Sequence, residues 1–244
     1  MLDEIDNLAW QYLTETWDGE IVMHFAKVTC VNGVKHGKYI LTNDEGIIVS
    51  NHYYDNGEPD GECIDYYETG KMKTLYLYKK GKLIRKTTFH TNGVISGDIT
   101  VDKYYRYSCD YDIIGLDRGM ILADGIYKTW YDNGKLREYI TYKNGIKYGK
   151  HMYYYDNGQL HHKEYYINGK ICSFSKSYHK NGKLEHIRRY IGRHHELEKF
   201  WHENGQLALE SNYRYGVYHG RHRVWDETGV LLSERYYKYG IEIK

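Results

Sequence analysis

Apolar residues recur at fixed distances after a series of glycines. Two positions after the glycine the residue is Ile48, Met72, Ile95, Leu136, Leu160, Leu184, Leu207 or Leu231. Eight positions after it stands Tyr54, Tyr78, Tyr142, Tyr166, Tyr190, Tyr213 or Tyr237. These two positions differ by an even number, so in an extended strand both side chains lie on one face, whereas helical spacing would place them about 240° apart. The pattern predicts β-strands of about five to eight residues.

The turns between these strands repeat with a period of 23 or 24 residues. One series of Asn-Gly or equivalent turns comprises Gly33, Gly57, Gly81, Gly134, Gly158, Gly182, Gly205 and Gly229. A second series falls between them at Gly46, Gly70, Gly93, Gly145, Gly169, Gly192, Gly216 and Gly240. Asn-Gly is the strongest short-range hairpin signal, and a fixed period indicates stacked copies of one unit. We therefore predict an all-β, elongated antiparallel meander of repeated hairpins of about 24 residues.

The period breaks between Gly93 and Gly134, which divides the chain into four predicted parts. Residues 28–97 and 125–244 form two sub-arrays, and 98–124 is a degenerate or inserted repeat. Residues 1–27 form an N-terminal cap, in which Leu2, Ile5 and Leu8 have helical spacing. A helix over 2–13 would either cover the first sheet edge or dock on another protein.

Two neighbouring aromatic rows precede the turns. The first row holds Tyr53, Tyr66, Phe89, Trp130, Tyr154, Tyr178, Trp201 and Trp225. The second holds Tyr54, Tyr67, His90, Tyr131, Tyr155, His179, His202 and Asp226. Adjacent residues of a strand point to opposite faces, so we expect the first row to pack and the second to be more solvated. A two-residue turn would pair the second row with the Leu position and a three-residue turn with a bulge would pair the first; the sequence leaves both open.

Composition adds limits on partner and compartment. The chain of 244 residues has formal net charge +1, so no global field attracts nucleic acid, which we do not expect as a partner. Cys30, Cys63, Cys109 and Cys172 have no metal-like spacing and are too few for a disulfide framework, which favours a reducing compartment. The acidic N-terminus is unlike a secretory signal and no apolar stretch is long enough for a membrane helix. We expect a soluble cytoplasmic protein, with peripheral membrane attachment as the alternative.

Five turns are followed by a Gly-x-x-x-Gly motif, which spans 33–37, 57–61, 93–97, 145–149 and 216–220. An aromatic-x-x-x-Gly turn follows, as in the segments ending at Gly158 and Gly229. This pattern resembles the MORN repeat, specifically the longer variant of bacterial YwqK-type proteins described as antitoxins, over all but 1–27 and 98–124. The resemblance implies an extended antiparallel meander. It also implies an antitoxin-like role, which would require a partner toxin. The composition is similar to that of proteins from AT-rich genomes, including large DNA viruses, so the cytoplasm would then be the host's.

No nucleophile, phosphate-loop or zinc-protease motif is present, so we expect no enzyme activity, no catalytic residues and no cofactor. Carboxylates such as Glu164, Glu210 and Glu234 recur at one repeat phase and are interpreted as a polar face. We expect no metal site, because His179 and His202 would stand about two strands, or ~10 Å, apart. We interpret the many histidines as solvated, tyrosine-like positions.

Two surfaces remain as candidates for binding. Large rings are favoured at interfaces, so a protein partner is expected on the second aromatic row. The residues of this candidate face are Tyr67, His90, Tyr131, Tyr155, His179 and His202. An anionic phospholipid membrane, bound by a run of basic residues, is the alternative partner. These residues could instead simply form a solvated hairpin edge. The basic residues are Lys71, Lys73, Lys79, Lys80, Lys82, Arg85 and Lys86. Self-association through open sheet edges is a further expectation. We therefore predict a non-catalytic interaction scaffold.

Overall fold

The computed structural model describes residues 19–22, 26–103, 124–191 and 195–243. These residues form twenty β-strands and no helix, so the predicted all-β antiparallel meander is confirmed. The predicted helix over 2–13 lies outside the described residues, as does most of 98–124. None of the described segments is a helix with the length and hydropathy that a bilayer crossing needs.

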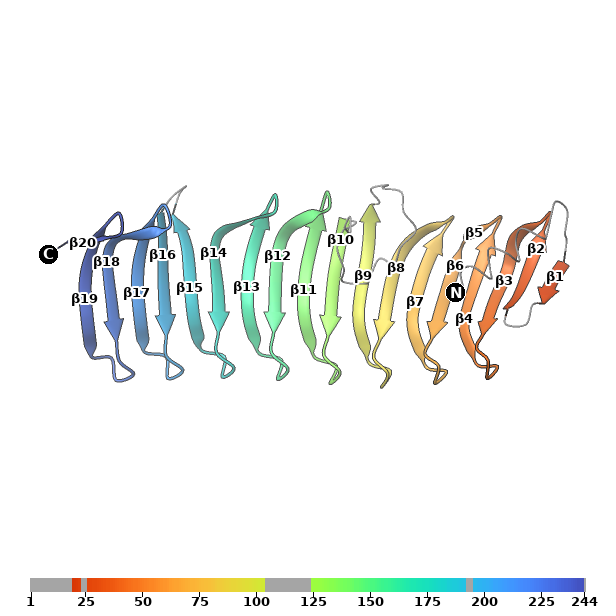
Figure 1. Ribbon diagram of the computed structural model, residues 1–244, viewed down its shortest axis with the longest axis horizontal. Coiled ribbons are helices and arrows are strands. Elements are labelled where there is room, and N and C mark those ends of the chain that lie inside the picture. The colour runs from red at the N-terminus through yellow and green to blue at the C-terminus, as the bar shows by residue number, and fades with distance from the viewer. Residues whose placement is uncertain (1–18, 23–25, 104–123, 192–194, 244) are drawn as a thin grey trace. The chain divides into compact units, whose positions relative to one another are not determined.

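Unit 1 ends at Val101 and contains the first eight strands and most of the ninth (Figure 1). Consecutive strands pair antiparallel, except that the fifth pairs with the fourth and the fourth also pairs with the sixth. The strands are β1 Gly19–Val22, β2 Ala26–Val31, β3 Val34–Thr42, β4 Ile48–Asp55, β5 Glu58–Pro59, β6 Gly61–Tyr66, β7 Met72–Lys79, β8 Lys82–Phe89 and β9 Ile95–Lys103. Strands therefore begin at Gly19, inside the predicted N-terminal cap. β9 likewise continues into the segment expected to hold the degenerate repeat.

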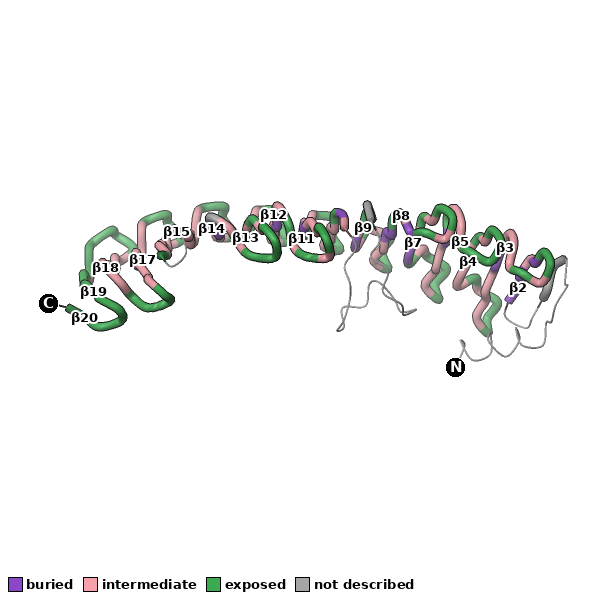
Figure 2. Tube along the Cα trace, turned by 90° about the horizontal axis from the view of Figure 1, so that it is seen from above, coloured by how far each residue is buried: buried purple, intermediate pink, exposed green. Residues whose placement is uncertain are grey.

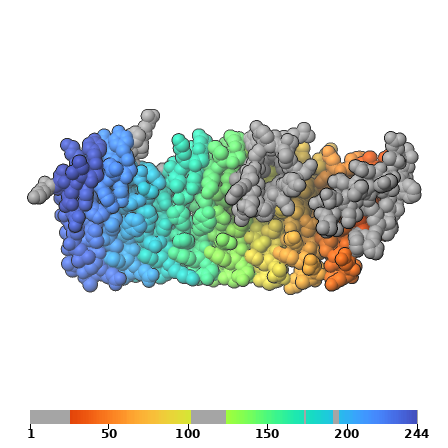
Figure 3. All heavy atoms as spheres, viewed as in Figure 1, coloured from red at the N-terminus to blue at the C-terminus, as the bar shows by residue number. Residues whose placement is uncertain are grey.

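Unit 2 begins at Asp102 and contains the remaining strands, again paired antiparallel in chain order. They are β10 Asp124–Trp130, β11 Leu136–Lys143, β12 Ile146–Tyr154, β13 Leu160–Ile167, β14 Lys170–Tyr178, β15 Leu184–Ile191, β16 His195–Trp201, β17 Leu207–Arg214, β18 Val217–Trp225, β19 Leu231–Lys238 and β20 Ile241–Ile243. In space-filling view the strands of each unit lie against one another along their length (Figure 3). Each unit is a sheet of consecutive hairpins.

Two kinds of turn alternate along each sheet. The first is a two-residue turn whose residues both have positive φ, as at Asn144 (54°) and Gly145 (71°). The second is a three-residue turn with a bulge, as at Tyr155, whose carbonyl accepts from the Gly158 amide at 2.8 Å. In this second turn the bulge pairs Tyr154 with Leu160. The structure thus decides the question that the sequence left open: the three-residue turn pairs the first aromatic row with the Leu position.

The turn types correct two details of the predicted repeat. Gly33, Gly57 and Gly81 lie in two-residue turns, whereas Gly134 and its successors in the same series lie in three-residue turns. The two glycine series therefore exchange roles across 98–124. Tyr53 and Tyr54 precede a two-residue turn, so their assignment to the aromatic rows was wrong. Thr42, which pairs with Ile48, occupies the first-row position in that repeat.

The second glycine of the Gly-x-x-x-Gly motif forms a bulge in the strand that follows a two-residue turn. Its φ is positive at Gly37, Gly61, Gly149 and Gly220, between 74° and 99°. Such φ values favour glycine because a Cβ would clash with the backbone. At Gly149 an added Cβ would also lie 2.9 Å from Thr141 Oγ1. Gly97 follows a three-residue turn, so the 93–97 motif is not equivalent to the other four.

The two sides of each sheet differ in burial. We define face 1 as the side that carries the directly paired side chains of Val28 and Tyr39 in unit 1, and of Ile140 and His151 in unit 2. Face 2 is the opposite side. Most buried side chains belong to face 1, and turns are exposed (Figure 2). The buried side chains of face 1 include Ala26, Val28, Cys30, Tyr39, Cys63, Ile99, Ile140, His151, Ser175 and Ser211.

This burial arises without a second layer of described residues. Tyr39 is 6% exposed because the Tyr54 ring packs edge-on at 6.2 Å and the Lys35 ammonium lies 4.5 Å from its ring centroid. Tyrosine joins a large apolar ring to a polar tip, which suits lateral covering of neighbours on a half-buried sheet. The abundance of tyrosine thus follows from the single-layer architecture.

Candidate interaction surface

The six rings of the candidate aromatic face occupy the same position in six three-residue turns. The polar tips of five of them bind the next repeat. Tyr155 Oη donates to the Tyr178 carbonyl at 2.9 Å, and His179 Nε2 donates to the Trp201 carbonyl at 2.8 Å. The same contact recurs from Tyr67 to Phe89, Tyr131 to Tyr154 and His202 to Trp225, at 2.7, 2.7 and 3.1 Å. Each of these five rings is therefore fixed by a neighbour 22 or 23 residues further along the chain.

Asparagine and lysine side chains of the same turns form parallel rows of contacts. Asn157 Nδ2 donates to the Lys180 carbonyl at 3.0 Å, and its Oδ1 accepts the amide of Gln159 at 2.9 Å. The equivalent donors are Asn133, Asn181 and Asn204, which reach Asp156, Glu203 and Glu227. The Lys183 ammonium likewise donates to the Asn204 carbonyl at 2.8 Å. Turns of successive repeats are thus joined by side chains in addition to strand pairing.

The two aromatic rows do not differ in burial as expected. Trp130 and Tyr154 of the first row and Tyr131 and Tyr155 of the second are all half-buried. Because the tips are held by hydrogen bonds, the second row presents its rings in fixed orientations at one turn per repeat. His90 belongs to the same row and is also half-buried. Binding by this face remains a prediction.

The basic residues of 71–86 differ in burial and in their contacts. Arg85 forms a two-point ion pair with Asp98 at 2.7 and 3.1 Å. Lys86 is 4% exposed on face 1, with its ammonium 5.1 Å from the Tyr76 ring centroid. Lys71 donates to the Thr91 carbonyl at 3.0 Å. Lys73, Lys79, Lys80 and Lys82 are exposed around the hairpin. The seven cations therefore do not share one face, because adjacent strand residues point to opposite sides.

Face 1 of unit 2 carries a charged network centred on His151, whose side chain is 3% exposed. Its Nε2 lies 2.9 Å from Glu138 Oε1, and its Nδ1 lies 3.8 Å from Glu164 Oε2. Tyr166 Oη donates to Glu164 at 2.7 Å and His162 Nε2 contacts the same carboxylate at 3.0 Å. Two carboxylates thus flank one buried imidazole. The interpretation of the histidines as solvated positions does not hold for His151.

Hydrogen bonds set the pKa values of these carboxylates. The hydrogen bond from His151 lowers the pKa of Glu138 below its ordinary value, against the effect of burial. Burial alone would raise the pKa of Glu164, but hydrogen bonds from Tyr166 and His162 outweigh it and lower that pKa. Burial, together with a hydrogen bond to Glu138, raises the pKa of Tyr153 to about 12. The network favours ionised carboxylates and neutral tyrosines.

Two further histidines of face 1 are shifted by burial. Burial lowers the pKa of His186, which stacks on Phe200 at 4.1 Å between ring centroids. Burial also lowers the pKa of His222, with help from the charge of Arg235. Neutral imidazoles are therefore the stable form of both side chains in the folded state.

These shifts predict a loss of stability in acid that occurs in two stages. His186 and His222 have folded pKa values below their ordinary 6.5, so their contribution is present above pH 6.5 and is lost as pH falls below it. Glu138 and Glu164 have folded values below 4.5, so theirs is lost as pH falls below that value. Melting temperatures measured from pH 8 to pH 3 should decline in both windows. In an E138Q/E164Q double variant the lower decline should shrink while the upper one persists; an unchanged profile would contradict the assignment.

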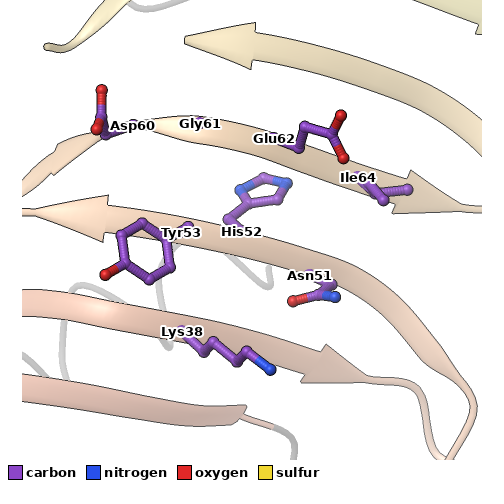
Figure 4. Close-up of a pocket in the computed structure, with 8 residues that line it drawn as sticks. All are labelled: Lys38, Asn51, His52, Tyr53, Asp60, Gly61, Glu62 and Ile64. Carbon is purple, nitrogen blue, oxygen red and sulfur yellow. The ribbon is translucent and has the colours of Figure 1, made fainter. Parts of the chain in front are cut away.

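A hollow of about 380 Å³ opens in unit 1 where β5 interrupts the pairing of β4 with β6. Pro59 has no amide proton for the ladder, and the Asp60 amide donates instead to the Tyr53 carbonyl at 2.9 Å. Figure 4 shows its lining residues on three neighbouring strands. They are Lys38, Asn51, His52, Tyr53, Asp60, Gly61, Glu62 and Ile64. His52 is already bound to Asp65 at 2.9 Å, and the mixed charges indicate no single ligand class.

The spacing of residues along the chain does not identify His151 and its carboxylates as a group. The available signal was alternation: Glu138, Ile140 and Tyr142 share parity, as do His151 and Tyr153. Bringing the two sets together needs the register of β11 with β12, which places Ile140 opposite His151. Among the described residues no group of three or more His, Cys, Asp or Glu side chains is arranged to hold a metal ion.

Comparison with known families agrees with the repeat geometry. The family model described as the MORN repeat variant matches residues 59–80, 123–144, 147–171, 197–215 and 218–239. Each match spans one hairpin with a three-residue turn at its centre. The match concerns the repeat itself and does not support assignment to the antitoxin family. No curated protein matches the chain in sequence. Five hairpins of the chain therefore match the MORN repeat variant.

Proposed function

We propose that the protein is a non-catalytic scaffold that binds another protein along the second aromatic row. The observation that carries this proposal is a regular series of half-buried rings, five of which are each held by a hydrogen bond to the next repeat. Side chains whose orientation is already fixed lose little conformational entropy on binding. Tyrosine and histidine rings also combine apolar area with polar edges, which interfaces favour.

The buried titratable groups support a structural role over a catalytic one. His151 is enclosed between two carboxylates, and Ser211 is fully buried with its hydroxyl 2.7 Å from His222 Nδ1. Groups without solvent access do not meet a substrate. The cytoplasm remains the proposed location.

The other two candidate functions have weaker support. A lipid-binding role for residues 71–86 loses strength because Arg85 is paired and Lys86 is buried on the opposite face. An antitoxin-like role rests on resemblance alone, and no contact of the described residues bears on it.

The test distinguishes the contribution of the aromatic ring from that of the hydroxyl group at Tyr131 and Tyr155. A Y131F/Y155F variant keeps both rings and loses the tip hydrogen bonds, whereas Y131A/Y155A loses the rings as well. Tagged full-length chains are used for affinity purification from native cells, followed by mass spectrometry. A partner recovered with the wild type and the phenylalanine variant, and lost with the folded alanine variant, is the expected result. Equal recovery of that partner with the alanine variant would contradict the proposal.

A further inference from the structure

Four cations gather on face 2 of unit 2, on four successive strands. We name this set the basic surface: Lys150 on β12, Lys163 on β13, Lys176 on β14 and Arg189 on β15. Lys163 pairs with Met152, and Met152 with Tyr139, so the set lies on the side opposite to His151. Lys150 and Arg189 are exposed, and Lys163 and Lys176 are half-buried.

The strand register places these cations close together. Lys163 and Lys176 are directly opposite each other on neighbouring strands. Lys150 lies one pleat away from Lys163, since Lys150 pairs with Tyr165 and Met152 pairs with Lys163. Arg189 lies diagonal to Lys176 in the same way, because it pairs with Phe174. Neighbouring strands are about 4.8 Å apart, so the four charges span roughly 15 Å of the sheet.

No carboxylate among the described residues forms an ion pair with any of the four. On this face of β12–β15 the described acidic residue is Glu185, which lies at the bulge that begins β15. Further along, Glu210 on β17 is already held by Lys199 and Arg223, each at 2.9 Å. Like charges directly opposite each other destabilise a sheet, so the Lys163–Lys176 pair weakens the pairing of β13 with β14.

Apolar surface is interleaved with these charges. A hollow of about 500 Å³ is lined by Phe174, Lys176, Ile187, Arg189 and Tyr190. The exposed ring of Tyr165 stands next to it on β13, 38% exposed. On face 2 the hollow thus offers two cations beside the apolar side chains of Phe174 and Ile187, whereas Tyr190 shares the strand parity of Arg188 and belongs to face 1. Such a combination complements an anionic segment that also carries an apolar anchor.

We propose that the basic surface binds an acidic segment of a partner protein, with carboxylates against the four cations and an apolar side chain in the hollow. Single-stranded nucleic acid is a weaker fit, since bases need open ring faces for stacking. The Lys176 ammonium already lies 5.2 Å from the Phe174 ring centroid, and Lys163 lies 5.6 Å from that of Tyr178. With net charge +1, the chain also has no long-range attraction for a polyanion.

This inference deepens the proposed scaffold function by naming the chemistry of a partner, but it concerns different residues from the aromatic row. Binding by either surface can therefore be disproved without affecting the proposal for the other. Loss of binding in the Tyr131 and Tyr155 alanine variant tests the row, whereas the experiment below changes only lysines of face 2 and strand ends.

The test measures fluorescence anisotropy of a labelled peptide of four Glu-Asp-Phe-Gly repeats, added to the full chain. We expect binding that weakens as NaCl is raised, because exposed charges are screened. A K163Q/K176Q variant should weaken the affinity by about tenfold or more. The matched control is K170Q/K238Q, which removes the same charge from exposed lysines beside two-residue turns and should leave the affinity unchanged.

Two further readouts make the outcome decisive. The melting temperature of K163Q/K176Q should equal or exceed that of the wild type, because a like-charge pair is removed. A lower melting temperature would assign the lysines to the fold and overturn the proposal. So would failure of the wild type to bind the acidic peptide, or an equal loss in the control. Tighter binding of single-stranded oligothymidylate, or of phosphatidylcholine vesicles containing phosphatidylserine, would also overturn it in favour of those partners.

Discussion

Replacing His151 by alanine should reduce the free energy of unfolding by about 3–5 kcal/mol, because it breaks a buried ionic network and leaves a cavity. His151 is enclosed between Glu138 and Glu164 and contacts the rings of Tyr153 and Tyr166 at 4.5 and 5.9 Å. Its removal would leave Glu138 without its hydrogen bond from the imidazole and Glu164 without the ring 3.8 Å away. Urea denaturation at neutral pH, followed by circular dichroism, measures the change.

The control for this variant is His195→Ala, which changes an exposed histidine at the start of β16. A surface substitution of this kind should stay within about 0.5 kcal/mol of the wild type. If both variants lose the same stability, or if His151→Ala loses less than about 1 kcal/mol, the network does not contribute as the geometry indicates.

Replacing Tyr39 by alanine should cost unit 1 about 3–5 kcal/mol, the range for a large aromatic side chain removed from a core. Tyr39 lies directly opposite Val28, which is 1% exposed, and its ring packs against Tyr54 and Lys35. Without the ring, Val28 and Cys30 would be opened to water. A repeat array is stabilised mainly through neighbouring contacts, so the damage should concentrate in the strands around β3.

Hydrogen exchange measured by mass spectrometry tests both the size and the location of this effect. Amides of β2, β3 and β4 should lose protection first in Tyr39→Ala, while those of β16–β19 should keep theirs. The matched variant Tyr53→Ala removes a ring that is 43% exposed on the neighbouring strand and should alter exchange little. Uniform loss of protection through both units would contradict nearest-neighbour stabilisation.

Much of the fold could be predicted from local rules. The even spacing between the Leu and Tyr positions identified strands, and Asn-Gly pairs identified turns, because both signals act over a few residues. The assignment of each glycine to one of the two turn types was less well predicted. Gly57 and Gly134 have similar sequence surroundings but lie in different turns, since the segment between the sub-arrays shifts the phase. Tyr53 and Tyr54 were misplaced for the same reason.

The candidate site could be predicted only in part from the sequence. Tyr155 and His179 were recognised as one row, but their hydrogen bonds to the next repeat depend on how turns stack in space. The run of cations in 71–86 looked continuous in the sequence, yet strand alternation puts Arg85 and Lys86 on opposite faces. Linear proximity is a poor guide to a shared surface on a sheet, because each step along a strand reverses the side.

The strand meander, its hairpin turns and its repeat length could be predicted from the chain alone, because they follow from side-chain period and local backbone preference. Which distant side chains meet depends instead on the register of neighbouring strands in the folded sheet. Lys150, Lys163, Lys176 and Arg189 are 13 residues apart in the chain and share one surface through antiparallel register. His151 becomes buried between two carboxylates for the same reason. Register is fixed by turn type and bulges, so a shift of one residue would send each of these side chains to the other face.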